Sequence, residues 1–160
     1  MALPGYMEIT AENQGAIEGD VDLEGREGSI EILNFQHTVK IPSDTFGIPT
    51  GRRVHMPMTV GKVVDRSSPM LFQALCDSEL LTEVTIDWYR TDGSGMEELY
   101  YRLLLKNAQI TNIEFYVSDT ESAEHQVAGH REKISLVYDH IIWSHEVDGV
   151  EYEDAWSAER

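Results

Sequence analysis

The chain has 160 residues, of which 41% are hydrophobic and 26% are charged, a balance that is typical of a folded soluble domain and excludes disorder over most of the length. Its 29 acidic residues against 12 lysines and arginines give a formal net charge of −17 at pH 7. A surface this acidic repels phosphate groups, so we expect no nucleic-acid partner and no attraction to anionic lipid. We predict one domain over residues 1–160.

Targeting and redox signals are sparse. The first residues contain neither a basic nor a long apolar segment, so no secretory signal is expected. The longest apolar runs, 103–105 and 141–143, are far shorter than the roughly 20 residues that a membrane helix needs, which predicts no membrane insertion. The single cysteine, Cys76, excludes an intramolecular disulfide and is expected to be a buried small hydrophobe. We expect a protein that folds in the cytoplasm and needs dedicated machinery for any export.

Alternating apolar and polar residues dominate the chain and predict strands. In chain order, strands are expected at residues 6–10, 17–23, 29–39, 54–64, 82–91, 98–106, 113–117 and 134–138. A hairpin turn is expected at residues 92–95, and a second reversal at Asn107 and Ala108.

One helix and two long loops complete the prediction. Ser68 is a favourable N-cap and Pro69 suits the first helical position, so we place a helix at residues 69–77. The loops are residues 43–53 and 118–129. The pattern is typical of an all-β barrel or sandwich with one attached helix.

The strand pattern also predicts self-association. The runs 82–91 and 98–106 carry apolar side chains on both faces, as Tyr89, Tyr100 and Leu104 show on the nominally wet side. A single barrel has one interior, so the second apolar face requires a neighbour. A heterologous contact with closed symmetry would make a ring.

Residues 20–31 nearly match a calcium-binding EF-hand loop, with acids at Asp20, Asp22 and Glu24, a glycine, and Glu31 at the last position. That motif needs a helix on each side, whereas both flanks here alternate like strands. We therefore expect these acids to line one solvated strand face and to bind no calcium.

No other pattern indicates catalysis or a cofactor. The histidine pairs His125/His130 and His140/His145 are five residues apart, which points their side chains away from each other in a strand. The chain contains no nucleophile motif and no glycine-rich phosphate loop. Any acidic protein brings some carboxylates together, so paired-carboxylate hydrolysis has only weak support. We expect no enzyme activity, no metal and no cofactor.

Several ordered stretches give the sequence a resemblance to a known family. They are residues 26–31 (REGSIE), 36–37 (QH), 51–57 (GRRVHMP), 65–69 (DRSSP), 132–138 (EKISLVY), 142–143 (IW) and 154–156 (DAW). Their order and spacing from about Leu3 to Trp156 resemble the haemolysin-coregulated protein (Hcp) family, the inner-tube proteins of bacterial type VI secretion systems.

This resemblance implies a β-barrel of two sheets with one flanking α-helix that forms homohexameric rings. The rings stack head to tail into a tube inside a sheath, whose contraction expels the tube behind a spike protein. Effector proteins can travel in the ring lumen, and the subunit is secreted without a signal peptide. The family offers no catalytic residues. The alternative is a tail-tube subunit of a phage-like contractile particle.

The resemblance also suggests two assembly sites. The 43–53 loop corresponds to the family loop that reaches toward the next ring, and its ring-stacking candidates are Phe46, Gly47, Ile48, Arg52 and Arg53. The alternative is that both arginines pair with acids of their own subunit. Gln36 lies on the stretch that resembles the family's lumen-lining strand and is the candidate lumen residue.

Overall fold

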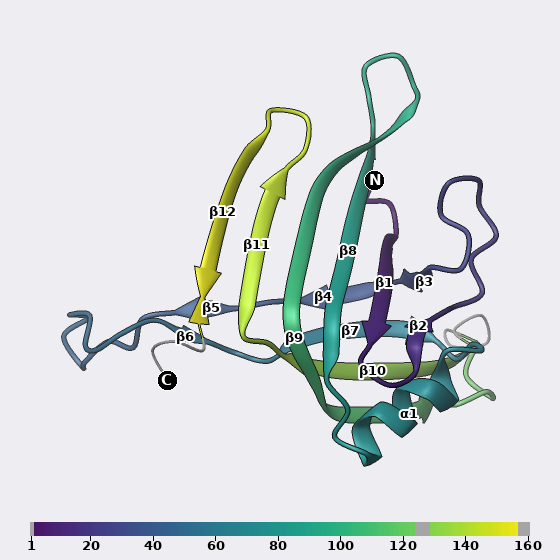
Figure 1. The fold of residues 1–160 in the computed structure, drawn as a ribbon, viewed down its shortest axis with the longest axis horizontal. Coiled ribbons are helices and arrows are strands. Elements are labelled where there is room, and N and C mark those ends of the chain that lie inside the picture. Colours follow the sequence, from purple (N-terminus) through teal and green to yellow (C-terminus); the bar gives the residue numbers. More distant parts are fainter. Residues whose placement is uncertain (1, 124–128, 157–160) are drawn as a thin grey trace.

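The computed structural model describes residues 2–123 and 129–156, and strands make up most of them (Figure 1). One helix, α1 (Ser68–Cys76), flanks the strands. The strands are β1 (Gly5–Ala11), β2 (Gly15–Ile17), β3 (Ile30–Ile32), β4 (Asn34–Gln36), β5 (Val39–Lys40), β6 (Val54–His55), β7 (Met58–Val63), β8 (Leu81–Thr91), β9 (Glu97–Val117), β10 (His130–Val137), β11 (His140–His145) and β12 (Val150–Ala155).

Two layers share one long strand, β9. Its first half pairs with β8 on one side and β11 on the other, and its second half pairs with β10. In Figure 1 the first layer stands upright, whereas β4, β7 and β10 cross behind and below it. Crossed sheets that share a bent strand enclose a core between their inner faces. The barrel-like arrangement of two sheets with one flanking helix confirms the predicted fold class.

The core between the layers is aliphatic. Met7, Ile30, Met58, Val84 and Leu105 are each 0% exposed and come from five different strands. The alternation of buried and exposed residues along β1, β8 and β10 matches the period of two that predicted these strands.

The predicted reversal at Asn107 and Ala108 is wrong. Asn107 adopts a positive φ of 52°, but β9 continues through it to Val117. Asparagine tolerates this left-handed conformation better than most residues, so a single irregular residue redirects the strand from one layer to the other without a turn.

The predicted strand at residues 17–23 is also wrong, because β2 ends at Ile17 and residues 18–29 form a loop. The 29–39 and 54–64 runs are each divided into shorter strands, the second at Met56 and Pro57. Proline has no amide hydrogen to donate to a strand pairing, which explains the break there. The sequence prediction missed β12, at the acidic tail.

Helix α1 lies within one residue of the prediction at each end, although its N-cap is Ser67 and not Ser68. Cys76, on the last turn, is exposed, so the prediction of a buried cysteine is wrong. Within the described residues, no helix has the length and apolar character needed to span a membrane. The predicted loop at 118–129 includes residues 124–128, which lie outside the described residues.

Candidate assembly surfaces

Residues 40–53 form an arm that projects from one end of the molecule and begins at the last residue of β5, in the short β5–β6 pair (Figure 1). Every residue from 41 to 52 is exposed, including Phe46 at 86% and Ile48 at 58%. Exposed aromatic and aliphatic side chains at the tip of an ordered loop are typical of a contact surface.

The arm has a defined conformation. Asp44 Oδ1 accepts hydrogen bonds from the amides of Phe46 and Ile48, both at 2.9 Å, and the Asp44 amide donates to the Ile48 carbonyl oxygen at 2.9 Å. Gly47, between them, has a φ of 78°, which glycine adopts without strain. Phe46 and Ile48 are thus presented on a closed turn.

The root of the arm is fixed by an ion pair within the subunit. Arg53 donates from Nε and Nη2 to the two carboxylate oxygens of Asp154, at 2.6 and 2.7 Å. Asp154 lies on β12, near the end of the described chain. These hydrogen bonds from Arg53, together with one from His55, hold the pKa of the Asp154 carboxyl below its usual value. Arg53 is therefore occupied in its own subunit, whereas Arg52 is exposed and forms no ion pair with the described residues.

A buried relay extends this ion pair into the fold. His55 Nε2 lies 2.7 Å from Asp154 Oδ2, and His55 Nδ1 lies 2.6 Å from the Tyr138 hydroxyl, which lies 2.7 Å from His37 Nε2. Burial, with a smaller contribution from the Asp154 carboxylate, raises the pKa of Tyr138, and burial beside His55 lowers the pKa of His37. With Asp154 ionised, one consistent arrangement of hydrogens has His55 donating to Asp154, Tyr138 donating to His55, and His37 donating to the Tyr138 hydroxyl oxygen.

We call these five residues, Arg53, His55, His37, Tyr138 and Asp154, the arm-root relay. Aromatic rings enclose it: Trp143 stacks on His55 with ring centroids 6.1 Å apart, and Trp156 lies 5.0 Å from the same ring. The relay thus joins the arm root and β6 to β12 through Asp154 and to the link between β10 and β11 through Tyr138.

Gln36 ends β4 and is exposed, one residue before the half-buried His37. It lines a shallow groove with Thr38, Lys40, Met56 and Thr59. Gln36 therefore lies beside the arm root, on a surface that is accessible in the subunit.

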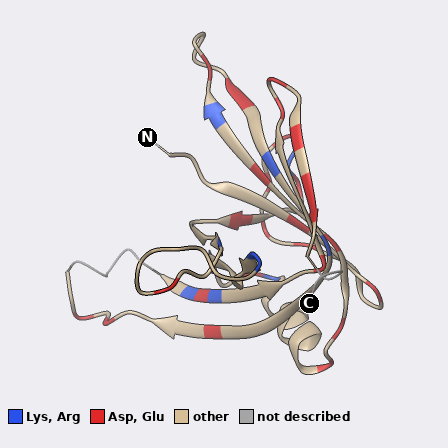
Figure 2. Ribbon diagram, turned by 90° about the vertical axis from the view of Figure 1, so that its left-hand side faces the viewer, with Lys and Arg blue, Asp and Glu red and all other residues tan. Residues whose placement is uncertain are grey.

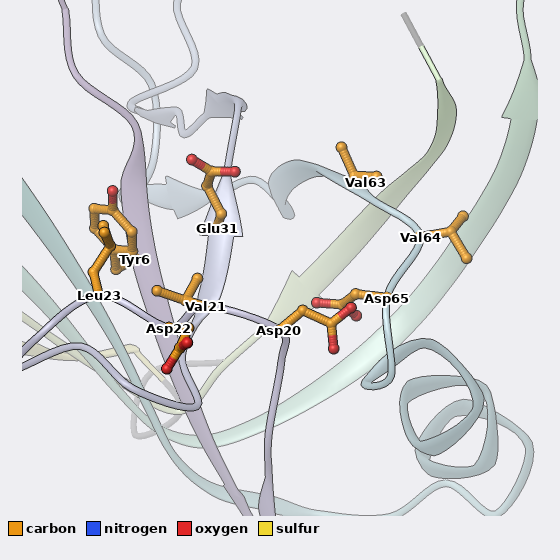
Figure 3. A pocket seen from close by; sticks show the side chains of 9 residues that line it. All are labelled: Tyr6, Asp20, Val21, Asp22, Leu23, Glu31, Val63, Val64 and Asp65. Carbon is orange, nitrogen blue, oxygen red and sulfur yellow. The ribbon is translucent and has the colours of Figure 1, made fainter.

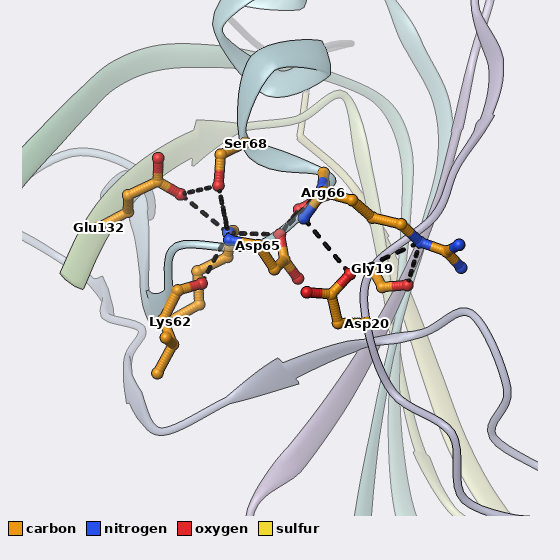
Figure 4. Close-up of polar contacts among 9 residues, drawn as sticks. Gly19, Asp20, Lys62, Asp65, Arg66, Ser68 and Glu132 are labelled. Carbon is orange, nitrogen blue, oxygen red and sulfur yellow. Dashed lines mark hydrogen bonds and ion pairs between the residues drawn. The ribbon is translucent and has the colours of Figure 1, made fainter. Parts of the chain in front are cut away.

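A second buried polar cluster fixes the start of α1 (Figure 4). The Lys62 side chain is 0% exposed, and its Nζ lies 2.8 Å from Glu132 Oε2 and 2.9 Å from Asp65 Oδ1. Ser68 Oγ donates to the same Glu132 oxygen at 2.9 Å and accepts a hydrogen bond from Lys62 Nζ at 3.1 Å. We call Lys62, Asp65, Ser68 and Glu132 the lysine cluster; it links β7, β10 and α1.

Most of the near-match to a calcium loop, including Asp20, Asp22 and Glu24, lies in the 18–29 loop, and only its last two residues, Ile30 and Glu31, lie on a strand, β3. This corrects the expectation that these three acids line a strand face. No helix flanks the motif, and no group of three or more potential metal ligands is found within residues 2–123 and 129–156. Of the histidines noted for their spacing, His140 and His145 lie beside Glu153 and Asp148 at 3.3 Å, and His125 lies outside the described residues.

Sequence reasoning missed the arm-root relay. Its members come from two distant parts of the chain, as do Arg53 and Asp154, which are 101 residues apart, so no local spacing reveals them. The one available signal was that the stretches containing His37, His55, Tyr138 and Asp154 all contribute to the family resemblance.

The family model described as "Type VI secretion system effector, Hcp" matches residues 6–145. The major exported protein of Pseudomonas aeruginosa is 39% identical, over 98% of this chain and 96% of its own length. Among solved structures, a variant of Hcp1 from the E. coli EAEC 042 pathovar has a TM-score of 0.87 at 31% identity, covering 97% of this chain and 99% of its own. The secreted protein Hcp3 from Pseudomonas aeruginosa has a TM-score of 0.80 at 35% identity, covering 96% and 97%.

More distant structures, such as Hcp1 from Salmonella typhimurium at 13% identity and a TM-score of 0.72, share the fold. The family match over most of the chain and the identity to full-length relatives agree with the resemblance seen in the sequence. The chain therefore belongs to the Hcp family of the type VI secretion system, whose members are structural components and not enzymes.

Proposed function

We propose that this chain is the subunit of a type VI inner tube: six copies form a ring, rings stack head to tail, and sheath contraction expels the tube behind a spike protein with effector proteins in its lumen. Family membership supports the general role of a tube subunit. The observation that carries assembly is the arm, an ordered and exposed turn that presents Phe46 and Ile48 to solvent.

The charge of the chain explains why the stacking contact needs a cation. Each subunit carries −17, so neighbouring rings repel one another over the Debye length of about 8 Å at physiological salt. Arg52 is exposed and forms no ion pair with the described residues, so it is available to a neighbour. We assign ring stacking to Phe46, Gly47, Ile48 and Arg52, and assign Arg53 to anchoring the arm.

Two single substitutions separate these roles. Arg52→Glu should leave rings intact in light scattering and negative-stain images but prevent tube growth. Arg53→Glu should destabilise the subunit, because it places a carboxylate against Asp154. Unaltered tubes in Arg52→Glu would remove Arg52 from stacking, and an 18.2 kDa monomer at micromolar wild-type concentration would contradict ring formation itself.

A further inference from the structure

Two exposed segments of opposite charge lie at opposite ends of the longest axis of the molecule (Figure 1). The arm, residues 40–53, contains three cations and one acid, a net charge of +2. The acidic loop, residues 18–31, contains six acids and one arginine, a net charge of −5. Figure 2 shows that acidic residues also run along the tall hairpins. The arm therefore carries a net positive charge in a chain whose overall charge is −17, and the acidic loop carries the opposite sign.

The acidic loop forms one wall of an open pocket of about 430 Å³ (Figure 3). Leu23 and Val63, which are 49% and 41% exposed, provide apolar surface in it. Asp22 and Glu31 also line it, and neither forms an ion pair with the described residues. The pocket thus combines apolar walls with available carboxylates, which complements an apolar tip followed by an arginine.

Contacts within the subunit fix the acidic loop, and thus one wall of the pocket, in the absence of a partner. The Arg26 guanidinium lies 3.6 Å from the Tyr89 ring centroid and 4.8 Å from that of Tyr6, and it pairs with Glu97 at 2.6 Å. Gly19 is so close to the opposite side of the loop that an added Cβ would lie 2.5 Å from the Ser29 carbonyl oxygen. A preformed pocket loses little conformational freedom on binding.

We propose that this pocket receives the arm tip of a second copy of the chain, with Phe46 and Ile48 against Leu23 and Val63, and Arg52 beside Asp22 and Glu31. The inference rests on the proposed tube function and names the receptor of its stacking contact. Because the arm tip and the pocket lie at opposite ends of one subunit, each copy can insert its arm into one neighbour and receive the arm of another. Such a heterologous contact propagates head to tail.

A charge exchange tests the pairing. The pocket variant Asp22→Lys/Glu31→Lys and the arm variant Arg52→Asp should each form rings that do not stack, and combining all three changes should restore stacking. Glu24→Lys/Glu27→Lys is the charge-matched control, because both residues are exposed on the same loop outside the pocket, and it should stack like the wild type. Wild-type stacking by the pocket variant, or no rescue in the combined variant, would overturn the pairing.

Disulfide trapping tests the location. All proteins carry Cys76→Ser, because Cys76 is exposed. Thr45→Cys, beside the tip, is mixed with either Leu23→Cys in the pocket or Leu33→Cys, a similarly exposed leucine in a separate, uncharged pocket. On a non-reducing gel, dimers should form through Leu23→Cys and be largely absent with Leu33→Cys.

The outcomes separate this inference from the proposed function. Rings that cross-link through Leu33→Cys, or through two Thr45→Cys arms, would overturn the pocket and leave the tube intact. Cross-links through Leu23→Cys in filaments without rings would support the pocket and contradict ring building.

Discussion

The lysine cluster and the arm-root relay are each built around one carboxylate, yet they hold different parts of the molecule. In the lysine cluster, Lys62 and Ser68 share one oxygen of Glu132, and in the relay Arg53 binds both oxygens of Asp154. The lysine cluster lies inside the body, where the side chains of Lys62 and Glu132 are 0% and 1% exposed. The arm-root relay lies under a projection, and its Arg53 side chain keeps 27% exposure. The first cluster fixes α1 to the sheets, and the second fixes the arm to the C-terminal strand β12.

The two clusters differ in how they respond to a change in pH. The lysine cluster contains no histidine, whereas two histidines and a tyrosine carry the relay from Asp154 to the arm root. The buried ion pair of the lysine cluster, between Lys62 and Glu132, is costly to break, because removing one partner leaves the other charged and desolvated. The relay instead contains His37, whose pKa is lowered by burial and by His55, so this residue gains a proton only at a lower pH than an ordinary histidine.

The largest effect should follow from breaking the lysine cluster. Lys62→Met keeps much of the volume but leaves Glu132 buried without its cation, so the free energy of unfolding should fall by about 3–5 kcal/mol. Urea denaturation measures this loss. Lys133→Met, at the exposed neighbouring position on β10, is the control and should stay within about 0.5 kcal/mol of the wild type. Equal stability of both variants would show that the cluster contributes nothing to the fold.

A smaller effect is expected from Asp154→Asn. The amide cannot pair with Arg53 as a charged acceptor, and it weakens the hydrogen bond to His55, so the loss should be about 2 kcal/mol. Tube growth should also be impaired under conditions where the subunit is still folded, because the arm loses the ion pair between Arg53 and residue 154 that fixes its root. Glu153→Gln, an exposed neighbour on β12, should change neither measurement. A variant that melts early yet stacks normally would separate the relay from arm function.

The pH dependence should come from His37. Its pKa is lowered by burial and by His55, so below about pH 6.5 the unfolded chain binds this proton more readily than the folded one. Stability therefore falls as the pH drops from about 6.5 through the lower folded pKa. The pKa of Asp154 is also lowered, so its contribution is present above about pH 4 and is lost only in stronger acid.

Urea denaturation at pH 7.5 and pH 5.5 isolates the histidine contribution, since Asp154 stays ionised at both. His37→Gln should be less stable than the wild type at pH 7.5 but should lose less stability on acidification. His140→Gln, whose ring lies at the surface beside Glu153, should retain the wild-type pH response. If His37→Gln retained the full wild-type response, another group would have to be its source.

The sequence predicted the parts of this molecule that local patterns determine. The period of two along β1, β8 and β10 was sufficient for those strands, and proline and serine located α1. It failed where one residue overrides the pattern, as Asn107 does by carrying β9 onward with a positive φ. It also failed for the relay, because a contact between Arg53 and Asp154 depends on the completed fold.

The smallest effect should come from Gln36, which adjoins His37 but is exposed where His37 is half-buried. Its side chain is free of the relay, so a substitution there changes the surface charge and leaves the arm anchored. If this surface faces the lumen, Gln36→Arg and Gln36→Glu should leave the ring and its melting temperature unchanged but lower effector co-purification a few-fold, since local charge affects encounter and retention. Gln109→Arg, at another exposed position, is the charge-matched control. Equal effector yield from all of these proteins would place the lumen-lining surface elsewhere on the subunit, whereas loss of the ring would assign Gln36 to a contact between subunits.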